Sequence, residues 1–286
     1  MQQNGRKKNP LVSIGMPVFN GEKYIIKALD SLLSQTYSNF KLIISDNAST
    51  DNTQKICEEY ALKDNRIKYV RQPENRGALF NFKFVLNNSM GKYFMWAAHD
   101  DWRSPEFLEV NTCALESNLK FVASMSPNCF DDEVNNQDKH VKFSLNGSLK
   151  ERFGEFLKKS WKSHAIYYSL MRTEIIKNYK DYNSLYAAHD WSLDFFLLSK
   201  GEINRAKTGL IVFGRFGDSM IKDPWKFYRK KKIEIFIPLY EFTKYALSLM
   251  KNLKYHEWLN VFFKLLKLNL QAMKTSYIIT IKGLFK

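Results

Sequence analysis

The chain has 286 residues, of which 45% are hydrophobic and 26% are charged, ordinary values for a globular protein that is long enough to bury a sizeable core. Three widely spaced cysteines form no CxxC pair and no metal-ligand cluster, which argues against a zinc module and for reduced thiols. No apolar stretch follows the basic N-terminus, and no run of 18 uncharged apolar residues occurs. We therefore expect neither a secretory signal nor a transmembrane helix.

The net charge of +15 is concentrated at one end of the chain. Residues 224–286 carry 13 basic and 3 acidic side chains, a net charge of +10, whereas residues 1–110 carry a net charge of +3. A basic surplus confined to one segment indicates an interaction surface there rather than general solubility.

The first 125 residues alternate between two patterns. Short apolar runs rich in β-branched residues predict strands, and apolar residues three or four positions apart predict helices. Strands are expected at 11–18, 40–45, 67–70, 92–97 and 121–125, and helices at 21–35, 51–63, 78–88 and 105–117. This order predicts an α/β fold, Rossmann-like, with a mostly parallel sheet and flanking helices.

The remainder of the chain is less regular. A polar surface segment is expected at 127–150, helices at 151–162 and 190–199, and strands at 166–171 and 209–215. From residue 224 the pattern changes to amphipathic helices with two apolar faces: Ile235, Leu239, Phe242, Ala246 and Leu249, then Trp258, Phe262, Leu266, Leu270 and Met273. We divide the chain into 10–126, 127–223 and a basic helical tail, 224–286.

Polar clusters follow three of the predicted strands, at Asn20–Glu22, Asp46–Asp51 and His99–Asp101. Ligands of parallel α/β sheets bind beyond the carboxyl ends of the strands, so we expect these clusters to meet at one edge. Asp100 and Asp101 are suited to a divalent metal that neutralises a diphosphate. The alternative is a helix cap formed by Asp101 or by Ser104.

Asp46 ends an apolar strand, where its carboxylate can accept a hydrogen bond from the N–H of a pyrimidine. The short polar side chains after it can reach a ribose. For Ser49, Thr50 and Asp51, capping of the following helix is the favoured interpretation.

Four strings in this region resemble the nucleotide-binding half of family 2 glycosyltransferases with the GT-A fold. They are VSIGMPVFNGEKYI, SLLSQTYSNFKLIISDNASTDNT, RIKYVRQPENRG and GKYFMWAAHDD, between Val12 and Asp101. They cover about a third of the chain in the family's order, which is more specific than any single motif. The resemblance implies an inverting, hexosyltransferase-type enzyme of bacterial surface polysaccharide, lipopolysaccharide or glycoconjugate synthesis, with UDP-sugar as the expected donor.

The resemblance also implies roles for individual residues. Nucleotide-binding roles fall on Pro17, Phe19, Glu22, Asp46, Asn47, Arg76 and Asp100. His99-Asp100-Asp101 stands at the DXD-type position, where Mn²⁺ or Mg²⁺ would bind and where Asp101 is the favoured ligand. His99 replaces the first carboxylate of the strict motif, which puts its role and the metal affinity in question.

A second motif, Ala187–Trp191, resembles the family's acidic motif that supplies the general base. Asp190 is the expected base and His189 the second candidate, although Asp190 could equally cap the following helix. Trp191 either stacks on the acceptor sugar or belongs to the core. Arg215, in the turn Phe213–Asp218, is expected to close over the diphosphate unless that turn is a plain surface loop. His164 and His140 are expected to be structural or solvent-exposed rather than catalytic.

The tail has two interpretations: its helices pack on the domain or on a second subunit, as in a homodimer, or they attach to anionic lipid. Aromatic and basic residues mix between positions 225 and 232, which favours the membrane and fits a lipid-linked glycan as acceptor. We expect a peripheral protein on the inner face of the cytoplasmic membrane.

Two other functions fit the sequence less well. A nucleotidyltransferase would share the α/β layout, but its Gly-rich basic phosphate loop after the first strand is missing, because Asn20–Lys23 is short and acidic. A nucleic-acid-binding protein would share the basic charge, but no recognition motif accompanies it. No nucleic-acid partner is expected.

Overall fold

One seven-stranded sheet forms the centre of the protein, whose computed structural model describes residues 11–181, 185–215 and 224–284, with the backbone alone for 224–225 and 280–284. Its strands are β1 (Val12–Val18), β2 (Phe40–Asp46), β3 (Ile67–Arg71), β4 (Tyr93–Trp96), β6 (Phe121–Met125), β8 (Leu170–Arg172) and β9 (Glu202–Arg205). Their order is β3-β2-β1-β4-β8-β6-β9, and β8 alone runs antiparallel to its neighbours. The predicted mostly parallel α/β sheet is therefore confirmed.

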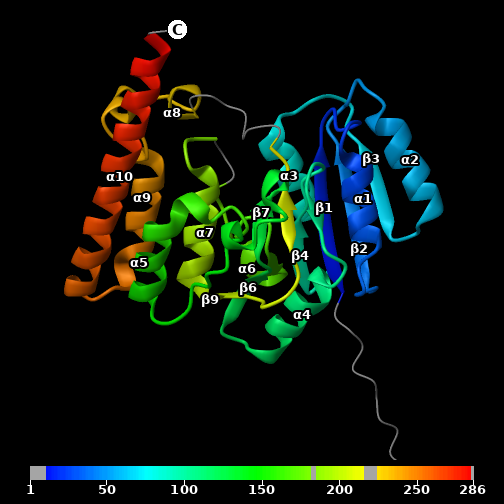
Figure 1. The fold of residues 1–286 in the computed structure, drawn as a ribbon, viewed down its shortest axis with the longest axis horizontal. Coiled ribbons are helices and arrows are strands. Elements are labelled where there is room, and N and C mark those ends of the chain that lie inside the picture. The colour runs from blue at the N-terminus through cyan, green and yellow to red at the C-terminus, as the bar shows by residue number, and fades with distance from the viewer. Residues whose placement is uncertain (1–10, 182–184, 216–223, 285–286) are drawn as a thin grey trace, which may run out of the picture.

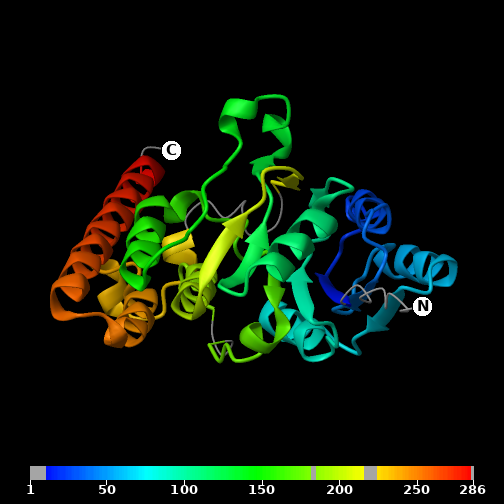
Figure 2. The ribbon, with the colours of Figure 1, turned by 90° about the horizontal axis from the view of Figure 1, so that it is seen from below.

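Helices cover both faces of this sheet (Figures 1 and 2). They are α1 (Ile25–Leu33), α2 (Thr53–Lys63), α3 (Ala78–Asn87) and α4 (Phe107–Ser117), with the short α6 (Thr173–Ile176) beside β8. In α1 the four apolar positions expected from the sequence, Ile25, Ala28, Leu29 and Leu32, are all buried. β1 is buried along its whole length, as expected for a parallel strand covered on both faces.

A second, three-stranded sheet lies next to the end of β4. It consists of β5 (Trp102–Arg103), β7 (Asn128–Phe130) and β10 (Ile211–Phe213), in the order β5-β10-β7. Two of these strands were not expected from the sequence, because runs of two and three residues are too short to show a period. Because β10 pairs with β5, this sheet holds the segment that follows β10 next to the segment that follows β4.

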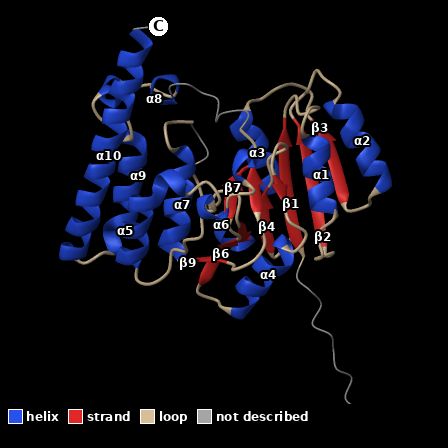
Figure 3. Cartoon of the chain, in the orientation of Figure 1, coloured by secondary structure: helices blue, strands red, loops and turns tan. Residues whose placement is uncertain are grey.

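The C-terminal part forms a helical layer on the far side of the sheet from α2 (Figure 3). It contains α5 (Leu149–Lys159), α7 (His189–Lys200), α8 (Pro224–Phe227), α9 (Tyr240–Leu249) and α10 (Tyr255–Leu284). Phe195 of α7 stacks on Phe153 of α5 with ring centroids 3.9 Å apart and meets Phe242 of α9 edge-on at 5.8 Å. Among the described residues, no helix is both long and apolar enough to cross a membrane.

The strand expected at Ile166–Met171 is largely wrong, because only Leu170 and Met171 of it belong to β8. Residues 163–169 form turns instead, in which the amide of Ile166 donates to the carbonyl of Ser163 at 2.8 Å. The hydroxyl of Ser169 also donates to the carbonyl of Ile166, at 2.6 Å. Such local serine contacts compete with strand pairing.

The expected apolar faces of the tail are only partly correct. Leu239, Phe242 and Ala246 are buried, but Ile235 is 42% exposed, because α9 begins only after Pro238. In α10 the face that was expected to be buried is not the one that packs on the protein, because Leu266 and Leu270 are 45% and 54% exposed. When a helix has two apolar faces, the neighbouring elements decide which of the two is buried.

We expect Phe195→Ala to lower the free energy of unfolding by about 3–5 kcal/mol, because it removes the ring that joins α7 to α5 and α9. Urea unfolding measures this loss. The matched control is Phe236→Ala, since Phe236 is 70% exposed. Equal stability of the two variants would show that the helical layer is not held by this contact.

Candidate active site

The loops that follow β1, β2 and β4 meet at the carboxyl edge of the sheet, as predicted. β1 pairs with both β2 and β4 in parallel, so the three strands end side by side, and Val18 pairs with Asp46. Among the described residues, the non-glycine residues with positive φ are Asn20, Ala48 and Ala188, and each lies in a loop that carries one of the predicted motifs. Strained backbone of this kind concentrates at functional sites.

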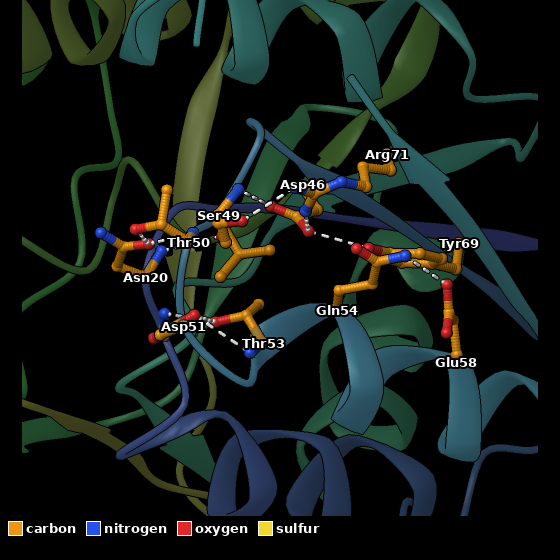
Figure 4. A network of polar contacts seen from close by, with 12 residues as sticks. Asn20, Asp46, Ser49, Thr50, Asp51, Thr53, Gln54, Glu58, Tyr69 and Arg71 are labelled. Carbon is orange, nitrogen blue, oxygen red and sulfur yellow. Dashed lines mark hydrogen bonds and ion pairs between the residues drawn. The ribbon is translucent and has the colours of Figure 1, made fainter. Parts of the chain in front are cut away.

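Side chains of the loop after β2 hold the backbone of the loop after β1 (Figure 4). The amide of Asn20 donates to Ser49 Oγ at 2.9 Å, and the amide of Gly21 donates to Thr53 Oγ1 at 2.7 Å. Asp51 accepts from the amide of Glu22 at 3.1 Å and from the amide of Thr53 at 3.0 Å. These polar residues are therefore structural, but Ser49 does not cap α2, whose N-cap is Asn52 without a side-chain cap; Asp51 alone accepts from an amide of its first turn.

Asp46 is fully buried, and its carboxylate is held by three donors (Figure 4). Oδ1 accepts from the amide of Ser49 at 2.8 Å. Oδ2 accepts from the hydroxyl of Tyr69 and from the guanidinium of Arg71, both at 2.8 Å. Tyr69 and Arg71 lie on β3 and were missed in the sequence, although the pairing of Asp46 with Arg71 across β2 and β3 could have indicated Arg71.

The other residues expected to bind the nucleotide differ in their exposure and in their hydrogen bonds. Pro17 is buried in β1, and Phe19 is 42% exposed. Glu22 Oε2 accepts from the amide and the side chain of Asn52, both at 2.8 Å, so this carboxylate is already bound within the loops.

Asn47 fixes the turn that contains Arg76. Its side chain accepts from the amide of Arg76 at 3.0 Å and donates to Asn75 Oδ1 at 2.8 Å and to the carbonyl of Gly77 at 3.2 Å. The side chain of Arg76 is exposed and lies 3.8 Å above the ring of Phe80. Asn47 thus acts on the turn, and the charge of Arg76 faces solvent.

Asp101 is 4% exposed and contains a buried oxygen without a hydrogen-bond partner among the described residues, Oδ2. Its Oδ1 accepts from the amide of Gly214 at 3.1 Å. Burial raises the pKa of Asp101 to about 7; Arg103, itself buried, opposes this rise, whereas Asp100 adds to it. The backbone of Gly214 also lies so close to Asp100 that a Cβ atom there would be 2.7 Å from Oδ2.

This arrangement fits a divalent cation at Asp101 and Asp100. Mg²⁺ and Mn²⁺ prefer oxygen ligands and usually bind through one or two carboxylates together with substrate phosphates. Within the described part of the chain, no group of three His, Cys, Asp or Glu side chains is arranged to hold a metal. The ring of His99 lies against Gly21, and burial lowers its pKa. The geometry therefore does not join His99 to the two carboxylates as a third ligand.

Asp190 lies in the first turn of α7 and is half-buried. Burial raises its pKa, and the neighbouring His164 and His189 oppose this rise. His189 is 7% exposed, and its Nε2 lies 3.0 Å from the carbonyl oxygen of Asp181, so this nitrogen carries a proton and donates. Of the two residues expected as base, Asp190 is the one whose side chain is a carboxylate that can accept a proton, although backbone amides of Asp190 and Trp191 already donate to it.

Two aromatic residues that were not expected to be catalytic lie near these carboxylates. Burial raises the pKa of Tyr168 well above its usual value, and Asp101, Asp100 and Asp190 add to this rise. His164 is exposed and meets the rings of Phe130 and Phe213 edge-on, at 5.7 and 6.5 Å. The turns of residues 163–169 place both side chains here, which a strand prediction could not reveal.

Trp191 and Arg215 are placed differently from what the sequence suggested. Trp191 is 6% exposed and packs edge-on against Trp161 and Phe242, which favours the core alternative. Arg215 binds Asp132 at 2.9 Å and lies 4.2 Å above the ring of Phe130, so it faces the segment after β7. The remainder of its turn, 216–218, lies outside the described residues.

Known proteins resemble this chain in sequence. The model of glycosyl transferase family 2 matches residues 13–190, more than half of the chain. Glycosyltransferase GlyA of Streptococcus pneumoniae serotype 4 is 37% identical over 98 residues, 34% of this chain and 14% of that protein. Putative glycosyltransferase EpsE of Bacillus subtilis is 34% identical over 113 residues, 39% of this chain and 41% of that protein. The chain thus matches less than half the length of these relatives.

Two solved structures share the fold over most of the chain. TarS 1–349 of S. aureus in complex with UDP has a TM-score of 0.60 at 18% identity and covers 87% of this chain and 68% of its own. Mannosyltransferase PcManGT of Pyrobaculum calidifontis, in complex with GDP-Man and Mn²⁺, has a TM-score of 0.60 at 14% identity, covering 97% and 76%. These likenesses confirm the expected GT-A fold.

We expect Asp101→Asn to stabilise the metal-free protein at pH 8 by about 1–3 kcal/mol. Because the pKa of Asp101 is higher in the folded state than its usual 3.8, ionisation weakens the fold as the pH rises from 3.8 to about 7. The amide resembles the neutral carboxyl group and avoids this cost.

Urea unfolding in the presence of EDTA tests this expectation, with the same comparison at pH 4 as its control, where the two proteins should differ little. A variant less stable than the wild type at pH 8 would contradict the assignment of Asp101 as a buried, unfavourable carboxylate.

Proposed function

Because the chain belongs to glycosyl transferase family 2, we propose that it transfers a sugar from a UDP-sugar to a hydroxyl group of a glycan or a lipid-linked acceptor. The reaction is that of an inverting hexosyltransferase in the synthesis of a bacterial surface polysaccharide, lipopolysaccharide or glycoconjugate. The observation that carries this proposal is the buried, unpartnered oxygen of Asp101, at the same sheet edge as Asp46. The bacterial origin of GlyA and EpsE supports the setting.

The nucleoside is bound at the ends of β1, β2 and β3. A carboxylate offers about four lone pairs, and Asp46 uses three of them on Ser49, Tyr69 and Arg71. We assign the remaining one to the N–H of the uracil base, which reaches this buried carboxylate once the side chains that cover it move aside. Phe19, which is exposed, contacts the base or the ribose.

The diphosphate lies at Asp100 and Asp101. A divalent cation such as Mn²⁺ or Mg²⁺ supplies charge neutralisation for the leaving group when bound there. Support comes from the orphaned Oδ2 of Asp101 and from PcManGT, whose structure contains GDP-Man and Mn²⁺. Arg76 has an exposed guanidinium that adds positive charge on the other side of the diphosphate.

Asp190 acts as the general base. As the acceptor oxygen forms its bond to the anomeric carbon, the bond from that carbon to the diphosphate breaks with both electrons going to the diphosphate, and Asp190 takes the hydroxyl proton. Its raised pKa favours this role, because a base is most effective when its pKa approaches the working pH. Tyr168, a neutral phenol that interacts electrostatically with Asp101 and Asp190, provides a hydrogen-bond donor to the substrates.

The setting we propose is the inner face of the cytoplasmic membrane, where the basic segment 224–286 contacts anionic lipid. Its net charge of +10 supports this placement. A homodimer is the alternative use of the same segment.

We expect Asp190→Asn to lower the rate of UDP release from the donor by about 10²–10⁴-fold, because the amide cannot accept the proton. Binding of UDP, measured by calorimetry, should stay as in the wild type. The matched control is Asp138→Asn, an exposed carboxylate on another part of the chain. Wild-type turnover by Asp190→Asn would exclude Asp190 as the base.

A thermal-shift screen tests donor class and metal dependence together. With UDP-GlcNAc, UDP-glucose and GDP-mannose, each with Mn²⁺ or with EDTA, one UDP-sugar should raise the melting temperature by about 5 °C at about 100 times its Kd, and only with metal. A shift of equal size in EDTA would contradict the metal site. Release of pyrophosphate instead of UDP would identify a nucleotidyltransferase.

A further inference from the structure

The long helix α10 has two apolar faces, and one of them packs against the rest of the chain. The packed face is formed by side chains that are at most 1% exposed: Val261, Leu265, Leu268 and Ala272. It faces α5 and α9, and Asn269 beside it donates to Thr243 Oγ1 of α9 at 2.9 Å. The position of α10 in the helical layer is therefore fixed by this face.

The other face of α10 is an apolar stripe that faces outward. Its members are Phe263, Leu266, Leu270 and Tyr277, which are 61%, 45%, 54% and 63% exposed. Their spacings of three, four and seven residues place them in one line along the helix. Nothing in the described part of the chain covers these side chains, which we call the outer stripe. A line of large exposed apolar side chains indicates a binding surface.

The charges beside the outer stripe favour one kind of partner over another. Lys267 and Lys274 are exposed and seven residues apart, so they form a row along one margin of the stripe. No acidic residue follows Glu257 in α10 or after it. A second copy of the helix would bring lysines against lysines without a partner carboxylate. An anionic lipid surface would instead attract both lysines while its acyl region takes up the apolar side chains.

We propose that the outer stripe of α10 docks on an anionic lipid bilayer. Its apolar side chains enter the boundary between headgroups and acyl chains, and Lys267 and Lys274 contact the lipid phosphates. The helix is 30 residues long, about 45 Å, and lies along the membrane rather than through it.

A second basic and apolar segment lies at the end of the molecule where α10 finishes (Figure 1). Phe227 and Phe236 are 67% and 70% exposed, and Lys230 and Lys232 between them are exposed as well. Figure 1 shows α8 at the end of the molecule where α10 finishes, which is also the side to which the carboxyl ends of β1 and β2 point. This segment is therefore a second exposed basic and apolar region, near the end of α10 (Figure 1).

The docked position limits the acceptor, a step that rests on the proposed function. α10 packs on α5, and α5 packs on α7, the helix that carries Asp190. Neighbouring helix axes are about 8–10 Å apart, so about 20 Å separate the outer stripe from the base. A hydroxyl in the headgroup layer cannot reach Asp190 across these helices. The acceptor is therefore a glycan that extends from its lipid carrier, and its reactive hydroxyl lies several sugars away from the bilayer.

Vesicle flotation with the full chain tests the docking surface. The probes are vesicles of phosphatidylcholine alone and with about 30% phosphatidylglycerol, at about 0.1 M and about 0.5 M NaCl. We expect the wild type to bind only the anionic vesicles, more weakly at high salt. Leu266→Ser with Leu270→Ser, and separately Lys267→Glu with Lys274→Glu, should each weaken binding at least tenfold.

The matched control is Leu62→Ser with Leu119→Ser, because these leucines are 89% and 84% exposed but lie outside the helical layer. It should bind vesicles as the wild type does. Absence of wild-type binding, or equal binding by the outer-stripe variants and the control, would overturn the proposal. So would a wild-type dimer, seen by light scattering without lipid, that Leu266→Ser with Leu270→Ser converts to a monomer.

UDP release from the donor by the wild type is measured in parallel. Vesicle binding without turnover of any nucleotide-sugar would leave the docking surface standing and contradict the proposed function. Turnover without vesicle binding would support the proposed function and contradict the docking surface.

Discussion

The hydrogen bonds between the loop after β1 and the loop after β2 are the constraint on which the site depends. Both loops lie past the ends of their strands, where no strand among the described residues pairs with them. The amides of Asn20 and Gly21 donate instead to side chains of the loop after β2. Backbone groups that are buried without a partner are costly, so these contacts fix the conformation of both loops at once. The left-handed conformations of Asn20 and Ala48 persist because the surrounding contacts hold them.

A rigid edge of this kind allows an unfavourable carboxylate to be kept at its centre. Asp101 is buried with one oxygen unpartnered, and its pKa is raised mainly for that reason. The amide of Gly214, delivered by the second sheet, satisfies only the other oxygen. The fold thus gives up stability at the position where the proposed diphosphate site requires an available oxygen, a common relation between function and stability.

The helical layer contains both the helix that carries Asp190, α7, and the helix that carries the outer stripe, α10. Phe195 fixes α7 against α5 and α9, and α10 packs on the outer side of the same helices. The layer therefore sets two things together: the place of Asp190 and the direction in which the outer stripe of α10 faces. The proposed membrane surface and the proposed base thus belong to one packed unit.

The sequence by itself determined the α/β order, the buried strands and the meeting of three polar clusters at one edge, because these follow from periodicity and from the rule that parallel strands end together. It also placed Asp46, Asp101 and Asp190 at strand ends or at a helix start. Only the tertiary structure decided the partners: Arg71 on Asp46, and Tyr168 near the three carboxylates, come from segments whose local pattern indicates an ordinary strand. The phase of α10 was decided in the same way, since a helix with two apolar faces shows in its sequence that both exist but not which one its neighbours will cover.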